Sequence, residues 1–290
     1  MNARTLDHLV LPVGGLAEAR ARLDRLGFTV APDARHPFGT ENACVFLKDG
    51  VYLEPLAVGD EAAYVRSAET GNVFTAQDRQ VRRLSPECGL SAVVLASDDA
   101  VADDRHYRRS GFSAGNILEF SRMVSLPDGG EAAASFRLAF AVSKRSPRFF
   151  LFSCQRIDPL PRDMGGLVCH ANGVSGLKEI VLSAAAPQEE CRLLETVLEV
   201  EGKAEGGAMV FGARNGVVRV LPGEAPAIGT GGAGGGARPG LRGRAVVFSV
   251  ADLAVTAAVL AANDVPFLRR EGRLCVPDAT GQDVVFAFEE

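Results

Sequence analysis

The chain has 290 residues, nearly half of them apolar and under a quarter charged, as expected of a folded globular protein with one large domain or two ordinary ones. A net charge of −5 and the lack of any Lys/Arg block argue against a nucleic-acid surface. The sequence contains neither a membrane-length apolar run nor a signal-peptide pattern, so we expect a cytoplasmic protein that does not enter a membrane.

The first predicted unit begins with LDHLVLPVGGLAEARARLDRLGF (6–28), an apolar strand, a polar turn and a helix of about three turns. Gly27 suits the position after a helix, where a left-handed backbone is needed. Two more strands follow in NACVFLKDGVYLEPL (42–56), and Asp49-Gly50 predicts a hairpin turn between them. The pattern is therefore βαβββ.

The same pattern recurs along the chain. LSAVVLASDDAVADDRHYRRSGF (90–112) aligns with 6–28 without a gap, and strand-like runs follow at 134–144 and 148–154. Looser copies begin at 177 and 244, and Asn215-Gly216 repeats the hairpin signal in the third copy. Four βαβββ units of an α+β protein are thus predicted, with domains at 1–160 and 173–290 and the boundary between about Ile157 and Ser175.

Glycines crowd the stretch 225–243 between the third and fourth units. A phosphate-binding loop would need a G-x-x-x-x-G-K-[ST] motif leading into a helix, and neither is present. We therefore interpret this stretch as a flexible surface linker.

The segments LDHLVLPV, RHPFGTENACVFL and YLEPLAV, within the first sixty residues or so, resemble the glyoxalase-like domain proteins of the vicinal oxygen chelate superfamily. The resemblance implies that βαβββ units pair into cupped, mostly antiparallel sheets with helices outside. It also implies a divalent metal, held by ligands from the first and last strands of each unit, that chelates two neighbouring oxygens of a substrate.

On this resemblance His8 and Glu54 match the two ligand positions of the first unit, and iron, manganese, nickel or zinc would suit an imidazole and a carboxylate. The second unit has Ala92 and Phe152 at the corresponding places, and neither binds a metal. Glu179 falls opposite His8 in the third unit, which makes it a third candidate ligand. The fourth unit offers only Ala245 and, in its last strand, Phe286 or Phe288.

Structural roles compete with these assignments. A histidine in an apolar strand is often a hydrogen-bonded core residue, and Glu54 can instead bond an arginine or backbone amides. His36 and Asn42 belong to a loop that resembles a cavity-flanking stretch, so they are candidate substrate contacts. Phe152 could present an apolar wall to a ligand. His170, beside an Asn-Gly turn, reads as structural.

Two functions remain open. The first is a metal-dependent lyase, isomerase or dioxygenase acting on a small oxygen-rich substrate, with Glu54 carrying a proton. The second is a metal-free protein that binds or sequesters a small molecule, which the missing ligands of the second unit favour. A purely structural role ranks last. Since one chain carries two complete pairs of units, we expect a monomer or a weak homodimer.

Overall fold

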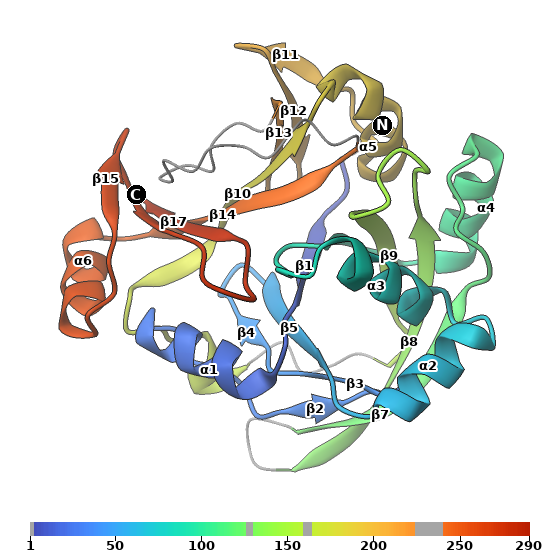
Figure 1. The fold of residues 1–290 in the computed structure, drawn as a ribbon, viewed down its shortest axis with the longest axis horizontal. Coiled ribbons are helices and arrows are strands. Elements are labelled where there is room, and N and C mark those ends of the chain that lie inside the picture. Colours follow the sequence, from blue (N-terminus) through green and yellow to red (C-terminus); the bar gives the residue numbers. More distant parts are fainter. Residues whose placement is uncertain (1–2, 126–129, 159–163, 224–239) are drawn as a thin grey trace.

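The structure, a computed structural model, describes residues 3–125, 130–158, 164–223 and 240–290 (Figure 1). The first unit consists of β1 (Leu6–Pro12), α1 (Leu16–Arg25), β2 (Ala34–Arg35), β3 (Thr40–Asn42), β4 (Val45–Phe46) and β5 (Tyr52–Val58). The second consists of β6 (Ala92–Ala96), α4 (Ala100–Ser110), β7 (Leu118–Ser125), β8 (Glu131–Ala141) and β9 (Phe150–Arg156).

The second half repeats this order after a short 3-10 helix (Gly165–Val168). The third unit consists of β10 (Val174–Ala184), α5 (Pro187–Leu198), β11 (Lys203–Glu205), β12 (Ala208–Ala213) and β13 (Gly216–Pro222). The fourth consists of β14 (Arg242–Val250), α6 (Leu253–Ala262), β15 (Leu268–Arg270), β16 (Arg273–Val276) and β17 (Val285–Glu289). The expected linker at 225–243 lies mostly outside the described residues, as does 159–163 within the expected boundary.

The described strands form two sheets, one from each half of the chain (Figure 1). The first has the order β2-β3-β5-β1-β6-β9-β8-β7, with β4 also on β5, and the second has the order β11-β12-β13-β10-β14-β17-β16-β15. In every unit the first and last strands are parallel neighbours, and the first strands of paired units run antiparallel. The predicted α+β fold, with two cupped sheets and helices outside, is confirmed.

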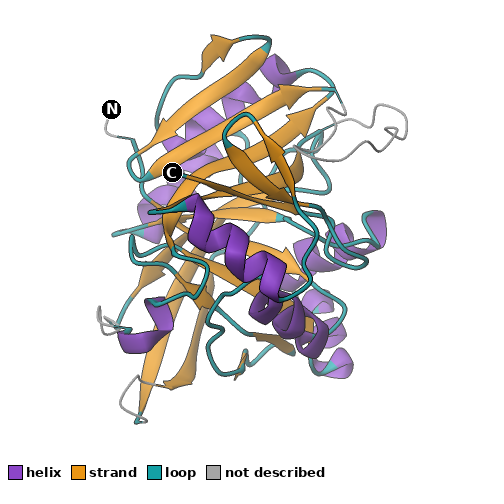
Figure 2. Cartoon of the chain, turned by 90° about the vertical axis from the view of Figure 1, so that its left-hand side faces the viewer, coloured by secondary structure: helices purple, strands orange, loops and turns teal. Residues whose placement is uncertain are grey.

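One continuous core includes residues of both sheets and of the helices α1, α5 and α6. Figure 2 shows helices lying against the strands. The core includes Leu9 and Val93 from the first sheet and Ile180 and Phe248 from the second, all of them shielded from solvent. The two halves therefore share one apolar layer, and each half has a further apolar cluster of its own on the other face of its sheet. None of the helices in the described ranges is long and apolar enough to cross a membrane.

The opposite, concave face of the first sheet is called the first cup here. Its apolar lining comprises Val10, Leu56, Ala92, Val94, Ala134, Phe136, Leu138, Phe140, Phe150, Phe152 and Cys154. Two helices absent from the sequence prediction, α2 (Glu61–Glu69) and α3 (Val73–Leu84), connect the first two units. Phe74 and Val81 of α3 pack into this cluster. The guanidinium of Arg82 donates to the carbonyl oxygens of Val13 and Leu56 at 2.9 and 2.8 Å, which attaches α3 to β1 and β5.

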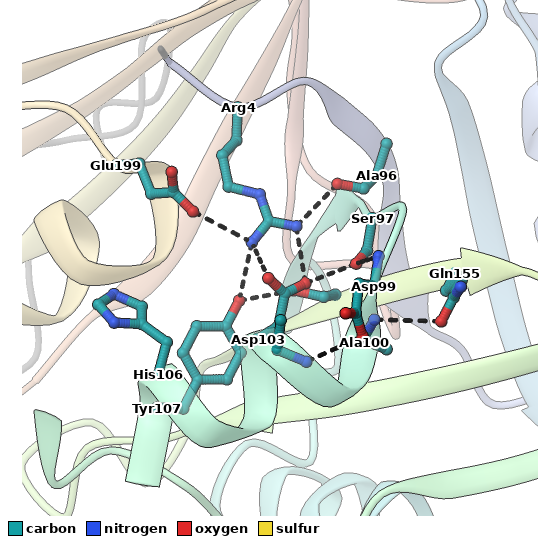
Figure 3. A network of polar contacts seen from close by, with 12 residues as sticks. Arg4, Ala96, Ser97, Asp99, Ala100, Asp103, His106, Tyr107, Gln155 and Glu199 are labelled. Atoms are coloured by element: carbon teal, nitrogen blue, oxygen red, sulfur yellow. Dashed lines mark hydrogen bonds and ion pairs between the residues drawn. The ribbon is translucent and has the colours of Figure 1, made fainter. Parts of the chain in front are cut away.

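The chain before β1 ties the two halves together through Arg4 (Figure 3). Its guanidinium donates two hydrogen bonds of 2.9 Å to Asp103 on α4 and one of 2.8 Å to the carbonyl of Ala96. It also lies 3.7 Å from Glu199, at the end of α5. Ser97 donates to the same Asp103 at 2.6 Å. Because these groups satisfy one another inside the protein, we interpret the network as structural.

Arg4→Ala should lower the free energy of unfolding by about 3 kcal/mol, because Asp103 would lose the cation that compensates its burial. Urea unfolding followed by circular dichroism measures this change. Arg109→Ala, on the exposed side of the same helix α4, is the control and should change stability by less than about 0.5 kcal/mol. Equal stabilities of the Arg4 variant and the wild type would contradict the assignment.

Candidate functional site

His8 is held in place by the residue before it. Asp7 is an extra residue in the β1–β6 ladder, where Leu6 pairs with Leu95 and His8 already pairs with Val94. Such a bulge breaks the strict alternation of side chains, and the Asp7 carboxylate lies 2.6 Å from Nδ1 of His8. Arg156 of β9 forms a bidentate pair with the same carboxylate. Burial alone would raise the pKa of Asp7, but His8 and Arg156 lower it to about 2, so Asp7 is ionised.

Glu54 lies in the middle of β5, beside Val10 of β1 in the parallel ladder, with 6% of its surface exposed. Asn42 of β3 donates from Nδ2 to Oε1 of Glu54 at 2.6 Å. The other oxygen, Oε2, lies 3.6 Å from Nε2 of His8. The carboxylate inside this apolar strand is therefore met by an amide on one side and an imidazole on the other.

A second imidazole reaches Glu54 from the loop between β2 and β3. Gly39 allows the turn, because its φ of +90° suits glycine and a Cβ there would meet the backbone of Asp60 and Tyr64 at 2.5 Å. Nδ1 of His36 lies 2.9 Å from the hydroxyl of Thr40, and Nε2 lies 3.8 Å from Oε1 of Glu54. Burial, together with the nearby charges of Arg122 and His8, lowers the pKa of His36 to about 3, so it is neutral at pH 7.

Aromatic rings pack against both imidazoles. His8 stacks on Tyr52 with ring centroids 4.4 Å apart and meets the edge of Phe152 at 5.7 Å. His36 stacks on Phe38 at 5.0 Å and contacts Phe120 at 5.7 Å. The site is thus a small polar cluster, His8, His36, Asn42 and Glu54, enclosed by an apolar wall to which Phe152 belongs.

The ladders also show which positions of the two paired units correspond. Val10 pairs with Glu54 as Val94 pairs with Phe152, so Phe152 occupies the place of Glu54 in the second unit. Ala92 occupies the place of His8, because Val10 pairs with Ala92 across the junction as His8 pairs with Val94. The second unit therefore contributes apolar surface at both positions.

Glu179 lies in the other sheet, apart from this cluster. There Val181 pairs with Arg219, so Glu179 and Arg219 stand where His8 and Glu54 stand in the first unit. The Glu179 carboxylate accepts from Arg219 and, at 2.9 Å, from Arg273. Both of its oxygens are engaged by guanidinium groups, which leaves it poorly suited to bind a cation.

The last strand of the fourth unit differs from the prediction. Val247 pairs with Ala287, so Ala287 takes the last-strand position that the sequence assigned to Phe286 or Phe288. Both phenylalanines instead belong to the core between the sheets. The concave face of the second sheet, the second cup, is lined by small residues: Val181, Ala245, Val247, Cys275, Val285 and Ala287.

Other residues near the site had gone unassigned. Neither Asp7 nor Arg156 was predicted, because strict alternation along a strand turns Asp7 away from His8 and because Arg156 lies beyond the predicted strand 148–154. The sequence of β1 or of β9 alone does not show that Arg156, at the end of β9, reaches Asp7 with two hydrogen bonds. His170 is structural: it accepts from the Thr29 amide at 3.1 Å and lies 3.0 Å from the Phe46 carbonyl oxygen.

The side chains of this cluster are of the types that bind a divalent metal, but their arrangement suits a metal less well. His8, His36 and Glu54 supply two imidazoles and a carboxylate, a set that suits iron, manganese, nickel or zinc. Each imidazole also has its Nδ1 engaged by Asp7 or Thr40, as in metal sites. Among the described residues, however, no group of three or more His, Cys, Asp or Glu side chains is arranged so that it could hold a metal ion.

Comparison with known proteins places this geometry in context. A sequence model described as "Glyoxalase-like domain" matches residues 6–198. The fold is similar to a hypothetical protein from Staphylococcus aureus, with a TM-score of 0.66, 12% identity and 98% of each chain covered. It is also similar to a mutant of 4-hydroxymandelate synthase from Streptomyces coelicolor, with a TM-score of 0.61, 12% identity, and 99% and 92% coverage of this chain and that one.

A third similar structure is a fusion protein of a xylose isomerase-like TIM barrel and 4-hydroxyphenylpyruvate dioxygenase. It has a TM-score of 0.55 and 12% identity, and the match covers 99% of this chain and 48% of that one. At these identities the likeness concerns the fold. Comparison with curated proteins gave no match.

The low pKa of His36 predicts an acid-sensitive fold. Between about pH 6.5 and about pH 3 the unfolded chain binds a proton at His36 that the folded chain does not bind. The free energy of unfolding should therefore fall as the pH falls through this window. His36→Gln should lose about 2 kcal/mol less than the wild type between about pH 7 and about pH 4.5, as measured by urea unfolding.

His106→Gln is the control, because His106 lies on α4, away from the cluster, and bonds only to the Thr196 carbonyl among the described residues. It should show the same pH dependence as the wild type. An unchanged pH dependence in His36→Gln would contradict a neutral, buried His36.

Proposed function

Because this chain belongs to the glyoxalase-like domain family, we propose that its first cup binds a small oxygen-rich molecule at the cluster of His8, His36, Asn42 and Glu54. The observation that carries this proposal is the convergence of two imidazoles on the two oxygens of one buried carboxylate, at 3.6 and 3.8 Å. An apolar enclosure with a few converging polar groups is the usual form of a small-molecule site.

Each polar group has a distinct part in this proposal. The Asp7 carboxylate accepts a hydrogen bond from Nδ1–H of His8, and this contact directs Nε2 of the ring toward Glu54 and the ligand. His36 is neutral and offers Nε2 to a ligand hydroxyl or carbonyl according to its tautomer. Glu54 is the group that can take a proton from a ligand hydroxyl or carbon acid, while Asn42 holds its Oε1 in place.

Metal-free binding is the version that the arrangement favours. Ala92 and Phe152 occupy the two positions from which a paired unit would supply ligands, and neither side chain coordinates a cation. A divalent metal would act as a Lewis acid on the ligand's oxygens, but the described part of the chain holds no group of three or more His, Cys, Asp or Glu side chains arranged for one.

Metal-dependent lyase, isomerase or dioxygenase chemistry is the second candidate. The observation in its favour is that Asp7 and Thr40 each engage the Nδ1 of an imidazole, so both Nε2 atoms face the same carboxylate. Elemental analysis after incubation with iron, manganese, nickel or zinc distinguishes the two versions. Stoichiometric metal that survives dialysis would favour the enzyme, and metal that dialyses away would favour the binding protein.

Glu54→Gln and His8→Ala should each weaken ligand binding about tenfold or more, because each removes a buried polar partner of the ligand. The measurement is isothermal titration with 2-hydroxy acids, 2-oxo acids and catechols that raise the melting temperature of the wild-type protein. Glu41→Gln is the matched control, since Glu41 neighbours Asn42 on β3 but pairs with Arg35 instead of the cluster.

Circular dichroism should show that all three variants keep the fold. The proposal fails if none of these compounds binds the wild type, or if the Glu54 and His8 variants bind them as tightly as the wild type does.

A further inference from the structure

Arg122 is a cation without a counterion in the described part of the chain. It lies on β7, opposite Ala134 of β8, and its Nε is buried with no hydrogen-bond partner among the described residues. Its guanidinium lies over the ring of Phe136, with the central carbon 5.8 Å from the ring centroid. Arg122 as a whole is half-buried, and a buried N–H such as its Nε–H is costly to the fold when it has no acceptor.

Arg122 lies beside the candidate site. Phe136, over which it stacks, is itself stacked on Phe120 with centroids 5.1 Å apart, and Phe120 contacts His36 at 5.7 Å. The charge of Arg122 is also close enough to add to burial in lowering the pKa of His36. Burial raises the pKa of the Cys44 thiol, and Arg122 opposes that rise. Arg122 thus borders the same aromatic enclosure as His36.

Neighbouring arginines differ from Arg122 in this respect. Arg156 uses two nitrogens on Asp7, and Arg137 donates to Glu119 at 2.6 Å across the same β7–β8 hairpin. Arg137 is adjacent to Phe136 on β8, so its side chain leaves the opposite face of the sheet. The unpaired guanidinium is therefore the one that faces the first cup, where a ligand would supply the acceptor.

We propose that Arg122 binds an anionic group of the ligand, and that the ligand of the first cup is a small carboxylic acid carrying a second oxygen, such as a 2-hydroxy acid. This inference rests on the function proposed above and specifies the ligand class. The carboxylate pairs with Arg122 at the Phe120–Phe136 side of the cup. The neutral oxygen turns toward His36 and Glu54, since a second carboxylate beside Glu54 would be repelled.

Arginine suits this role because its planar guanidinium offers parallel N–H donors to both oxygens of a carboxylate. Its contact with Phe136 holds the plane of the guanidinium and limits the side-chain freedom lost on binding. The neutral state of His36 keeps the cation at Arg122 as the main attraction for the anion on this side.

The test compares an acid with its uncharged analogue. Isothermal titration should show that 2-hydroxy-4-methylpentanoate binds the wild type at least about tenfold more tightly than its primary amide, which keeps the hydroxyl and the apolar tail. Arg122→Gln should weaken binding of the acid by about tenfold or more and leave binding of the amide within about twofold. Arg137→Gln, the same change on the opposite face of the hairpin, should leave both affinities unchanged.

Four outcomes separate the inference from the function on which it rests. Selective loss of the acid in Arg122→Gln, with the variant folded by circular dichroism, supports the inference. Equal affinities of the wild type for acid and amide, both weakened by Glu54→Gln, would overturn the role of Arg122 and leave the proposed site intact. An unaltered affinity for the acid in Arg122→Gln would overturn it in the same way. Failure of both compounds to bind the wild type would overturn the proposed function and the inference together.

Discussion

The antiparallel pairing of β1 with β6, centred on Leu9 and Val93, sets the position of every group in the first cup. These two residues point into the core between the sheets, and their neighbours His8 and Val10 point into the cup. Every residue of β1 is buried, so a slip of one residue would place Leu9 in the cup and turn Asp7 and His8 out of their present positions. The register of this ladder therefore determines whether His8 meets Glu54.

The sequence carried enough information for the repeated units, because periodicity and turn glycines such as Gly27 are local signals. In the structure, strand pairing and the loop before β3 bring the five predicted residues together in the first cup: His8, His36, Asn42, Glu54 and Phe152. No helix was predicted between the first two units, although Asp60 caps α2 and Asn72 caps α3 with residue types that favour helix starts. Phe286 and Phe288 of β17 were wrongly assigned to the position that Ala287 occupies, because a shift of one residue cannot be seen in a sequence without the partner strand.

The two sheets have the same architecture but carry different polar pairs at equivalent positions. In the first, Nε2 of His8 and Oε2 of Glu54 lie 3.6 Å apart, too far for a strong hydrogen bond between them. In the second, the equivalent pair is Glu179 and Arg219, whose charges neutralise each other and are joined by Arg273. The second sheet thus uses its charged side chains to satisfy one another, whereas the first keeps two imidazoles near one carboxylate at 3.6 and 3.8 Å.

The apolar layer shared by the two sheets has a consequence for how the chain is made. During synthesis, all strands of the first sheet leave the ribosome before β10 does, so the face that carries Leu9 and Val93 has no second sheet to cover it. This apolar face of the first half stays uncovered while roughly the remaining half of the chain is translated. Such an exposed face is a natural target for chaperones, and truncation near residue 160 would leave a sticky, aggregation-prone product.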